Sequence, residues 1–428
     1  MIFWYFFYII QKLKNKNDKK LKEKLGISTF EETTKLNQYI SSCKKNNQEP
    51  KILWFHAESI GESFSIVSLI KKLYKKNYFI IFTTNTNIAK QAIKEKLNNK
   101  ISIQYFPYPN HLFLNRFYQT WKFSKIFFVE NEIYPNILSF AKKHNIKTYL
   151  LNARMSNNSF KYWAKFKFLI HKILIKYDYI FTSSKDETKK FLFLSDNYKN
   201  IECIGNLKIS SSILNSNEIE QEFNDIENKD TTVAKCKLLK KICENRKIIL
   251  FGSIHSEEFF HLIWQYIMLS KKINLIAIFA PRHLEEVEKL ENLLMQNNIT
   301  TIKWSNFCGN IENNAIIIDT IGELSKIYNI CDIAIVCGSF VNNIGGHNPL
   351  EPISLKKITF IGQYYDKCAN VIEPLLQHNA IIKTNHLYFD VIKFLKDLQL
   401  QQHVINSGIK FLEQNSNIDD KIIAKLKL

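Results

Sequence analysis

Residues 338–352 read Gly-Ser-Phe-Val-Asn-Asn-Ile-Gly-Gly-His-Asn-Pro-Leu-Glu-Pro, and this stretch is the most informative one for the fold. It follows the apolar run 333–337, which is typical of a buried strand. Asn348, Pro349 and Glu351 then have the pattern of a helix start, as its cap, first residue and third residue. The stretch therefore predicts a strand, a glycine-rich loop and the beginning of a helix.

A loop of this kind suits a bound anion. Gly345 and Gly346 let the backbone approach a ligand closely, and a helix N-terminus directs N–H groups at negative charge. Glu351 can also reach a sugar hydroxyl. The alternative is a purely structural turn in which Asn348 and Glu351 form a capping box. These residues alone leave both interpretations open.

Apolar runs of strand length alternate with helical patterns throughout the chain. Strands are expected at 51–55, 78–82, 101–106, 125–129, 147–151, 179–182 and 200–204, and again at 247–251, 275–279, 316–318, 333–336 and 358–361. Helices are expected between them, including 62–76, 88–97, 257–269 and 284–296. This order predicts an α/β protein with mostly parallel sheets covered by helices on both faces.

The length of 428 residues exceeds the limit of about 250–300 residues at which one core stops growing. The polar, charge-mixed stretch 208–245 interrupts the alternation, and we interpret it as a linker or insertion with room for one helix near its end. We therefore expect Rossmann-like domains at 21–207 and 246–405, with functional loops at the carboxyl ends of their strands and a cleft between them. A final helix is expected at 406–428.

The net charge of +19 favours anionic partners, although the lysine content is also explained by a bias towards AT-rich codons. Residues 1–10 are almost wholly apolar, and five lysines follow within ten residues. This run is shorter than the roughly 20 residues that span a bilayer, and its charge order is wrong for a secretory signal. We interpret 1–20 as a membrane-associated segment, the alternative being a helix packed on the protein itself.

Several function classes have no support in the sequence. The eight cysteines form no CxxC pair, and no Cys/His cluster has metal spacing, so neither a metal nor a cofactor is expected. Buried, reduced thiols and a cytoplasmic location fit these cysteines best. A nucleic-acid partner is not expected, because zinc-ligand spacing, RNA-binding motifs and basic heptad helices are all missing. A Walker-type lysine loop and a GxSxG turn are missing as well.

Residues 56–63, His-Ala-Glu-Ser-Ile-Gly-Glu-Ser, lead from a strand of the first half into a helix. Ser59 and Gly61 lie at the turn, where a glycine lets a ligand approach closely. Glu62 would lie in the first helical turn, where the helix dipole stabilises its charge, and it could accept a proton from an attacking hydroxyl. The alternative is a glutamate that only stabilises the helix start.

The next two strand ends carry 130–136, Glu-Asn-Glu-Ile-Tyr-Pro-Asn, and 152–156, Asn-Ala-Arg-Met-Ser. Placing the carboxylates of Glu130 and Glu132 at a strand end costs free energy unless they are exposed or paired. Arg154 could bind a phosphate or pair with one of these carboxylates. The sequence does not distinguish a binding site from a solvated helix start here. A helix with lysines among aromatic residues follows, and it suits either anionic lipid or a solvated face; its lysines are Lys161, Lys165, Lys167 and Lys172.

Four strand ends of the second half carry polar or glycine-rich loops. Arg282 is well placed for a phosphate or a carboxylate. Ser253 or His255 could contact a phosphate, although Ser256 beside them could simply cap a helix. The candidate residues of the four loops are Ser253, His255, Arg282, Gly322, Glu323 and, within 338–352, Ser339, Gly345, Gly346, Asn348 and Glu351. Together these loops predict an edge that binds an anionic group.

Eight short segments between about residues 50 and 370 resemble, in family order, the 3-deoxy-D-manno-octulosonic acid (Kdo) transferases of lipopolysaccharide synthesis. They are 56–62, 130–136, 152–156, 205–208, 253–255, 281–283, 319–324 and 338–352. The resemblance implies a GT-B fold, in which two Rossmann-like domains face a central cleft and the C-terminal helix crosses back to the first domain. It also implies an inverting, metal-independent transfer of Kdo from CMP-Kdo to the lipid A precursor lipid IVA, at the cytoplasmic face of the inner membrane.

The resemblance assigns the role of catalytic base to Glu62. We expect the donor to contact Lys208 in addition to the candidates of the second half, and we expect acceptor-side or structural roles for Ser59, Gly61, Glu130, Glu132 and Arg154. Some positions depart from the family's pattern: Glu58 stands where a small or apolar residue is usual, and Tyr134 replaces a usual Trp. Asn131 and Ile254 each replace a usual Thr.

Two other interpretations remain. One is another GT-B sugar-nucleotide enzyme, either a transferase with a different donor or an epimerase. The other is a membrane-surface binding protein that has lost catalysis.

Overall fold

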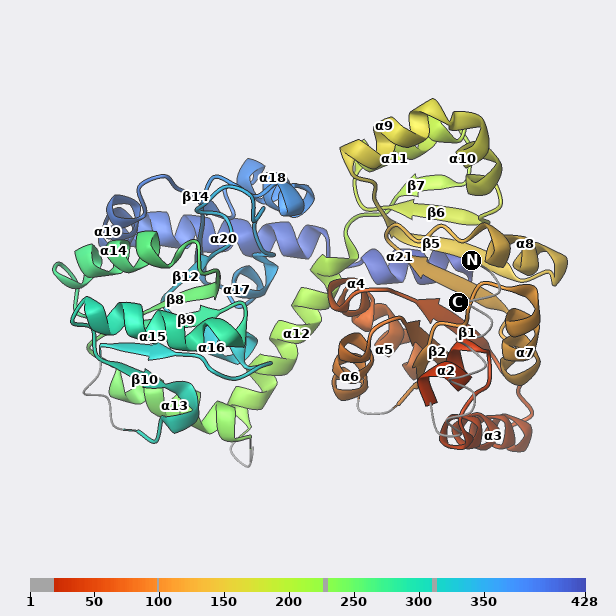
Figure 1. The fold of residues 1–428 in the computed structure, drawn as a ribbon, viewed down its shortest axis with the longest axis horizontal. Helices are drawn as coiled ribbons and strands as arrows, with labels where there is room; N and C mark the ends of the chain where they lie inside the picture. Colours follow the sequence, from red (N-terminus) through yellow and green to blue (C-terminus); the bar gives the residue numbers. More distant parts are fainter. Residues whose placement is uncertain (1–18, 98–99, 226–229, 310–313) are drawn as a thin grey trace, which may run out of the picture. The chain divides into compact units, whose positions relative to one another are not determined.

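The computed structural model describes residues 19–97, 100–225, 230–309 and 314–428. The chain divides into two compact units, unit 1 with residues 1–211 and 417–428, and unit 2 with residues 212–416. The described part of each unit contains one sheet, drawn with arrows in Figure 1, and each sheet has seven strands. The expected membrane-associated segment, 1–20, lies outside the described residues except for its last two.

The sheet of unit 1 is parallel throughout, with the strand order β3-β2-β1-β4-β5-β6-β7. The strands are β1 Ile52–His56, β2 Phe79–Thr84, β3 Ser102–Tyr105, β4 Lys125–Val129, β5 Lys147–Ala153, β6 Tyr179–Thr182 and β7 Ile201–Cys203. The order reverses between β1 and β4, and the carboxyl ends of strands at such a switch point form the usual ligand crevice of a doubly wound sheet. The fold thus directs attention to the residues that follow β1 and β4.

The helices of unit 1 are α2 Lys19–Lys24, α3 Phe30–Lys45, α4 Ile60–Ser65, α5 Val67–Lys75, α6 Asn87–Lys96, α7 His111–Trp121, α8 Pro135–Lys143, α9 Asn157–Lys165, α10 Lys167–Leu174, α11 Lys185–Leu194 and α21 Ile418–Leu426. The expected single helix over 62–76 is two helices, broken at Ile66. The hydroxyl of Ser65 donates to the carbonyl of Glu62 (2.6 Å) and competes with the helical backbone bonds there.

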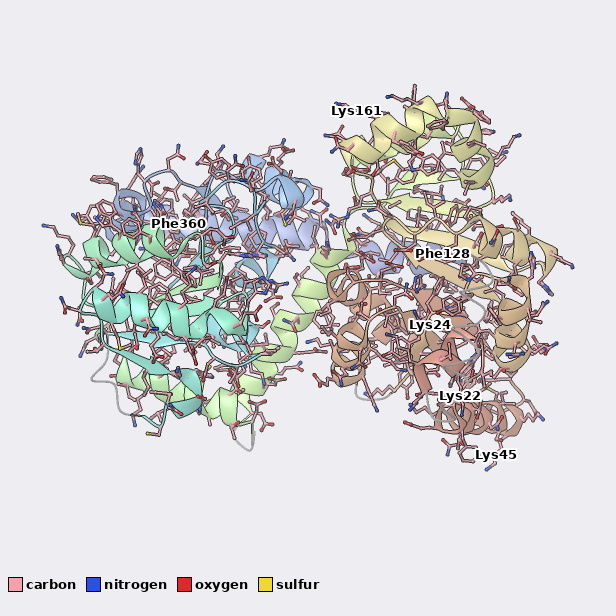
Figure 2. All side chains as sticks on the ribbon, in the orientation of Figure 1. Lys22, Lys24, Lys45, Phe128, Lys161 and Phe360 are labelled. Carbon is pink, nitrogen blue, oxygen red and sulfur yellow. The ribbon has the colours of Figure 1, made fainter. Side chains whose placement is uncertain are left out.

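Strands β1 and β2 of unit 1 are buried on both faces, which is why they appear in the sequence as continuous apolar runs. Trp54 of β1 lies on one face, in a cluster with Phe117 and Phe128, and Figure 2 labels Phe128 in β4. On the same strands Phe55 stacks on Phe127, with 4.4 Å between ring centroids.

The sheet of unit 2 is also parallel, with the order β10-β11-β9-β8-β12-β13-β14. Its strands are β8 Lys247–Ile254, β9 Leu275–Pro281, β10 Thr301–Lys303, β11 Ala315–Ile317, β12 Ile333–Val336, β13 Ile358–Ile361 and β14 Ile382–Lys383. Here the switch point lies between β8 and β12. The glycine-rich loop 338–352 follows β12, so it lies at the predicted ligand edge of this sheet.

The helices of unit 2 are α13 Thr231–Ile242, α14 Phe259–Ser270, α15 Val287–Gln296, α16 Leu324–Ile330, α17 Leu350–Ser354, α18 Ala369–Gln377, α19 Leu387–Lys396 and α20 Leu398–Gln414, with 3₁₀ turns η1 Leu284–Glu286, η2 Trp304–Asn306 and η3 Asp366–Cys368. Strand residues alternate between two clusters: Ile249 and Phe251 pack with α14 and α15, and Ile248 and Leu250 pack with α13 and α16. Both faces of the sheet are therefore covered, as the apolar runs predict.

The stretch 208–245, interpreted above as a linker with room for one helix, is largely helical. It contains most of α12, Leu207–Asn224, as well as α13. Helix α12 is not apparent from the sequence because serine and asparagine, both weak helix formers, make up much of it. Near the end of the chain, α21 packs in unit 1, where Lys125 Nζ donates to the carbonyl of Leu426 (3.1 Å).

Among the described helices, none combines the length and the apolar character that crossing a membrane requires.

Candidate functional site

His56 ends β1 at the switch point of unit 1 and is completely buried. Its Nδ1 lies 2.9 Å from the carbonyl oxygen of Thr83, and its ring stacks on Phe106 with 3.6 Å between centroids. Because a carbonyl oxygen can only accept, the hydrogen-bond network assigns the proton to Nδ1 and leaves a lone pair on Nε2. Burial lowers the pKa of His56 to about 3, so the ring is neutral.

Glu62 lies one turn beyond β1, in the capping box of α4. Its backbone N–H donates to Ser59 Oγ (3.3 Å), and its Oε2 accepts the N–H groups of Glu58 (2.9 Å) and Ser59 (3.4 Å). Glu62 therefore has the helix-start contacts that the alternative interpretation predicts. These contacts do not exclude a role as base, because within the described chain Oε1 has no hydrogen-bond partner, and a Cβ added at the adjacent Gly61 would meet nothing within 4 Å.

Glu130, directly after β4, is a buried carboxylate with two cationic partners. Arg154 Nε lies 2.5 Å from its Oε2, and Lys208 Nζ lies 3.0 Å from its Oε1. Asn152 Nδ2 also faces Oε1 at 3.4 Å. The sequence left two roles open for Arg154, binding a phosphate or pairing with a carboxylate. In the structure Arg154 pairs with a carboxylate. Lys208, which we expected at the donor, lies in unit 1 on this carboxylate.

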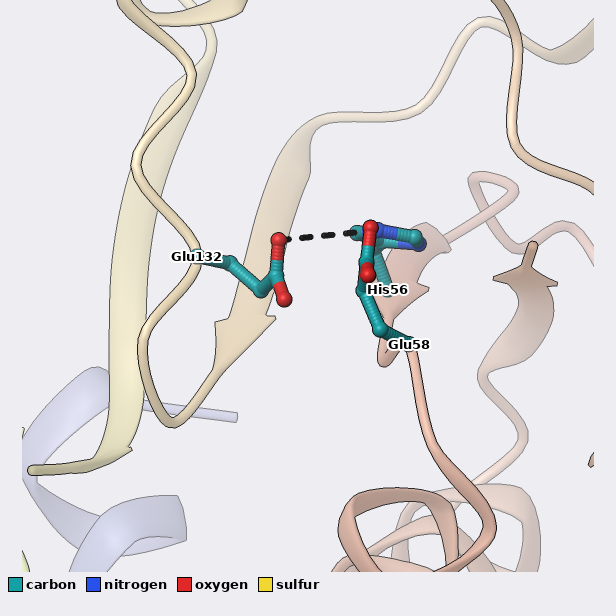
Figure 3. Close-up of side chains that lie close together, drawn as sticks. All are labelled: His56, Glu58 and Glu132. Carbon is teal, nitrogen blue, oxygen red and sulfur yellow. Dashed lines mark ion pairs between the residues drawn. The ribbon is translucent and has the colours of Figure 1, made fainter.

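Among the residues that the structure describes, Glu132 has no such cationic partner. Its Oε2 lies 3.9 Å from Nε2 of His56, as the dashed line in Figure 3 marks. Burial raises the pKa of Glu132 to about 7, with a smaller opposing effect from the hydrogen bond of Tyr134 and further raising by the charges of Glu58 and other nearby carboxylates. This carboxyl group therefore titrates near neutral pH.

Tyr134 and Glu58 complete the group around His56. Tyr134 Oη donates to Glu58 Oε1 (2.9 Å) and lies 3.4 Å from His56 Nε2. Asn85 Nδ2 donates to the same Glu58 oxygen (2.7 Å). Loops that follow three strands, β1, β2 and β4, thus supply one cluster of polar side chains at the carboxyl edge of the sheet.

His56, Glu58 and Tyr134 are absent from the site residues expected above, although all three lie in quoted segments. A signal for them was present: His56 and Glu58 flank the end of a strand at the switch point. Glu58 and Tyr134 are also two of the positions that depart from the family's pattern, and the structure joins them by a hydrogen bond. Because these two residues contact each other, the site differs locally from the family's pattern at this point.

In unit 2, a buried carboxylate organises the ligand edge. Glu258 is completely buried and accepts the backbone N–H groups of Gly338 (2.8 Å), Phe340 (3.0 Å) and His255 (3.1 Å). The loop after β8 is thereby tied to the glycine-rich loop after β12. Ser253, at the irregular end of β8, has a left-handed φ of +58°.

Three histidines gather at this edge of unit 2. His255 Nε2 and His347 Nε2 are 2.7 Å apart, and the ring of His283 lies 5.7 Å from that of His255. Burial lowers the pKa of His347 to about 4, and the neighbouring His255, Arg282, Lys367 and His283 lower it further. His255 also has a lowered pKa, mainly because of burial. The edge is rich in cationic and neutral donor groups, which suits an anionic ligand.

The glycines of the 338–352 loop are required by its geometry. Gly345 and Gly346 have φ values of +93° and +80°, and a Cβ on Gly345 would come 2.7 Å from Cγ of Lys367. Ser339, expected at the donor, is buried and donates to the carbonyl of Val336 (3.0 Å). Its hydroxyl also accepts the N–H of Gly362 (2.8 Å), so its observed contacts are structural.

The helix start predicted from this loop lies one residue later than expected. Asn348 Oδ1 accepts the N–H of Leu350 (3.2 Å), and α17 begins at Leu350 with Pro349 at its cap position. Glu351 is thus its second residue, and its carboxylate accepts from Ser325 (3.0 Å), so no capping box forms with Asn348.

The loop after β11 contains the remaining two candidates. Glu323 accepts the hydroxyls of Thr320 (2.5 Å) and Thr232 (2.7 Å), which occupies its carboxylate. Gly322 has a φ of +90° and nothing within 4 Å of an added Cβ, so the backbone is open to a ligand there.

Comparison with known proteins relates the chain to one family. Residues 20–211 match the family model described as "3-Deoxy-D-manno-octulosonic-acid transferase (kdotransferase)". A "Bifunctional glycosyltransferase/methyltransferase" of Fusobacterium nucleatum is 29% identical over 401 residues, which are 92% of this chain. The chain spans 60% of the length of that relative. A 3-deoxy-D-manno-octulosonic acid transferase of Rickettsia typhi is 28% identical over 389 residues, 88% of this chain and 79% of the relative.

A solved glycosyltransferase from Rickettsia africae has the same fold, with a TM-score of 0.60, 14% identity and coverage of 88% of this chain and 98% of that one. Each of the two units thus has the Rossmann-like fold expected from the sequence, and the chain shares the fold of this glycosyltransferase. Together with the motifs at the strand ends, these relationships make the chain similar to the 3-deoxy-D-manno-octulosonic acid transferases, which are glycosyltransferases, over most of its length.

Proposed function

We propose that the protein transfers Kdo from CMP-Kdo to the lipid A precursor lipid IVA, with inversion and without a metal ion. One observation carries this proposal: the ligand edge of unit 1 presents carboxylates around a neutral histidine, and the ligand edge of unit 2 presents histidines, Arg282 and a glycine-rich loop. Deprotonating an acceptor hydroxyl needs the first kind of edge, and holding a nucleotide phosphate needs the second.

On the donor side, Arg282, His255 and His347 bind the phosphate of CMP-Kdo, and the open backbone at Gly322 approaches the nucleotide. The bond between the sugar's anomeric carbon and the phosphate oxygen breaks, and CMP keeps the electron pair. Positive groups at this edge stabilise the charge that develops on the phosphate. A nucleoside monophosphate carries less charge than a diphosphate, so this leaving group needs no metal.

On the acceptor side, Oε1 of Glu62 takes the proton of the attacking hydroxyl. The hydroxyl oxygen then bonds to the face of the anomeric carbon opposite to the departing phosphate, which inverts the configuration. The sugar passes through a cation-like transition state, as in glycoside hydrolysis. The capping box holds the carboxylate of Glu62 in place through Oε2, so its position is fixed before the substrate arrives.

A peripheral position at the cytoplasmic face of the inner membrane is part of the proposal. Helix α9 has no buried residue, and Figure 2 shows Lys161 on its outer surface. Tyr162 of the same helix is 58% exposed, and Phe168 of the following helix, α10, is 63% exposed. Exposed aromatic side chains beside lysines are the combination that binds anionic lipid surfaces.

The test is incubation of the purified protein with CMP-Kdo and lipid IVA in the presence of a chelator, followed by mass analysis of the lipid. The proposal requires a mass increase of one or more Kdo residues and an equal release of CMP. Alternative sugar nucleotides assayed side by side decide between this donor and another. A lipid of unchanged mass, with no CMP released, would favour the interpretation as a membrane-surface binding protein.

A further inference from the structure

Three possible metal ligands converge at the carboxyl edge of unit 1. His56 supplies Nε2, and Glu58 and Glu132 each supply a carboxylate oxygen, with all three atoms within 4.8 Å of one another. Figure 3 shows the three side chains directed toward a common point. His56 is buried, and the two glutamates are half-buried, so a cation held there would be only partly hydrated.

The hydrogen bonds around His56 leave its Nε2 without a good donor. Nδ1 carries the ring proton, because it faces the carbonyl oxygen of Thr83. The single hydroxyl proton of Tyr134 is shared by the carboxyl groups of Glu58, at 2.9 Å, and Glu132, and the hydroxyl oxygen is 3.4 Å from Nε2. The next nearest group is the carboxyl group of Glu132, whose Oε2 is 3.9 Å away and thus beyond hydrogen-bond distance. A buried lone pair is therefore aimed into a cluster of acceptors, where a cation would satisfy it.

The charges around the cluster indicate the same kind of ligand. Among the described residues, no lysine or arginine forms an ion pair with Glu58, Glu62 or Glu132, although the chain has a net charge of +19. By contrast, Glu130 is paired with both Arg154 and Lys208. Among the described residues, the cluster of Glu58, Glu62 and Glu132 therefore has no cationic partner, whereas the neighbouring Glu130 has two.

We propose that His56, Glu58 and Glu132 bind one divalent transition-metal ion of the Zn²⁺ type. An imidazole nitrogen with two carboxylates suits such an ion better than Mg²⁺, which prefers oxygen ligands alone. The Thr83 carbonyl fixes the ring and its tautomer, as a second-shell partner of a metal-bound histidine does. Tyr134 yields its place between the ligands when the ion enters.

This site is not part of the metal-free transfer proposed above. An ion there would occupy Glu132 beside Glu62 and would hinder the acceptor, so we expect Zn²⁺ to inhibit transfer. The inhibition rests on the proposed function, whereas binding of the ion does not.

Metal binding is tested on the full chain without an affinity tag. Bound metal is first removed with EDTA, and the EDTA is then removed. We expect one equivalent of Co²⁺ to give a visible absorption band that Zn²⁺ abolishes and excess Mg²⁺ does not. Glu58→Gln should weaken Co²⁺ binding at least about tenfold, because it removes a ligand without emptying the core. The matched control is Asp186→Asn, which removes an exposed carboxylate of the same unit and should bind Co²⁺ like the wild type.

The proposal falls if the wild type shows no band at one equivalent of Co²⁺, if Mg²⁺ competes as well as Zn²⁺, or if Glu58→Gln and Asp186→Asn bind Co²⁺ alike. Thermal denaturation of each variant without metal excludes misfolding as the cause. In the transfer assay, the Zn²⁺ concentration that halves the rate should rise about tenfold in Glu58→Gln, with each protein compared to its own rate in EDTA. A protein that binds Co²⁺ as expected but never transfers Kdo would refute the proposed function and leave the metal site standing.

Discussion

The carboxylate of Glu258 accepts the backbone N–H of Gly338 at 2.8 Å, and this bond joins positions 80 residues apart in the chain. The same carboxylate accepts the N–H groups of Phe340 and His255. Burial raises the pKa of this carboxyl group, and the hydrogen bonds from the backbone donors oppose that rise. The bond sets the position of the glycine-rich loop relative to the end of β8, and both carry residues proposed to bind the donor.

Replacing Glu258 by Gln tests this role. The amide nitrogen of Gln cannot accept a hydrogen bond, so at least one loop N–H loses its partner, which should cost about 2–3 kcal/mol of unfolding free energy. Urea denaturation followed by a probe in unit 2 measures that loss. CMP affinity should fall as well, because the loop is no longer held. Unchanged stability and unchanged CMP binding together would show that the bond does not position the loop.

Glu62→Gln separates the two roles of Glu62. Glutamine also satisfies a capping box, so stability should change by less than about 0.5 kcal/mol. Transfer should fall about 10²–10⁴-fold, because an amide cannot accept the proton of the acceptor hydroxyl. Single-turnover transfer and CMP binding, measured on the same preparation, check both expectations.

The control for that experiment is Ser59→Ala, which removes the cap and leaves the carboxylate. It should lower stability by about 1 kcal/mol. Activity near the wild-type level in Glu62→Gln would remove Glu62 from the role of base, and Glu132 would then be the remaining candidate at this edge.

The parallel sheets could be predicted because their strands are buried on both faces and so appear as continuous apolar runs. The boundaries were less predictable where side chains compete with the backbone. The break at Ile66 arises from serine hydroxyls bonded to helical carbonyls, and the irregular end of β8 places Ser253 in a left-handed conformation. Helix α12 was missed because its stability comes from packing more than from its own residues.

For the site, the strand ends were predictable and the partners were not. The sequence shows two glutamates, Glu130 and Glu132, separated by one residue, and the fold alone decides that Arg154 and Lys208 reach only the first. In the same way, the contact between His255 and His347 depends on how two distant loops are held. Such pairings arise between elements far apart in sequence, where no local pattern records them.

The surface of α9 and α10 gives a prediction about lipid binding. Replacing the exposed Phe168 by Ser removes apolar contact without affecting the core, so binding to vesicles containing anionic lipid should weaken several-fold. Flotation with vesicles of graded anionic content measures this, and added salt should weaken binding of both proteins. Ile88→Ser, at a residue of α6 that is 68% exposed, is the matched control. Equal loss in both variants would mean that this surface is not the contact.

The pH dependence of stability should reveal Asp419 in α21. Burial raises its pKa to about 6, against the partial opposing effect of its neighbours Ser68 and Lys72, whereas in the unfolded chain it is ordinary. The folded protein therefore binds this proton more tightly, so the group's stabilising contribution is present below about pH 4 and is lost as the pH rises through 6.

Asp419→Asn removes that titration. Relative to the wild type, the variant should gain about 2–3 kcal/mol between pH 4 and pH 7, which is the free energy of a shift of this size. Urea denaturation across that range, followed in unit 1, provides the measurement. The adjacent Asp420 is exposed and pairs with Lys72 at 2.7 Å, so Asp420→Asn serves as the control and should show a difference that stays nearly constant over the same range. If the free energies of unfolding of Asp419→Asn and the wild type change in parallel with pH, the buried carboxyl group keeps its ordinary pKa. The packing of α21 would then not disfavour its charged form.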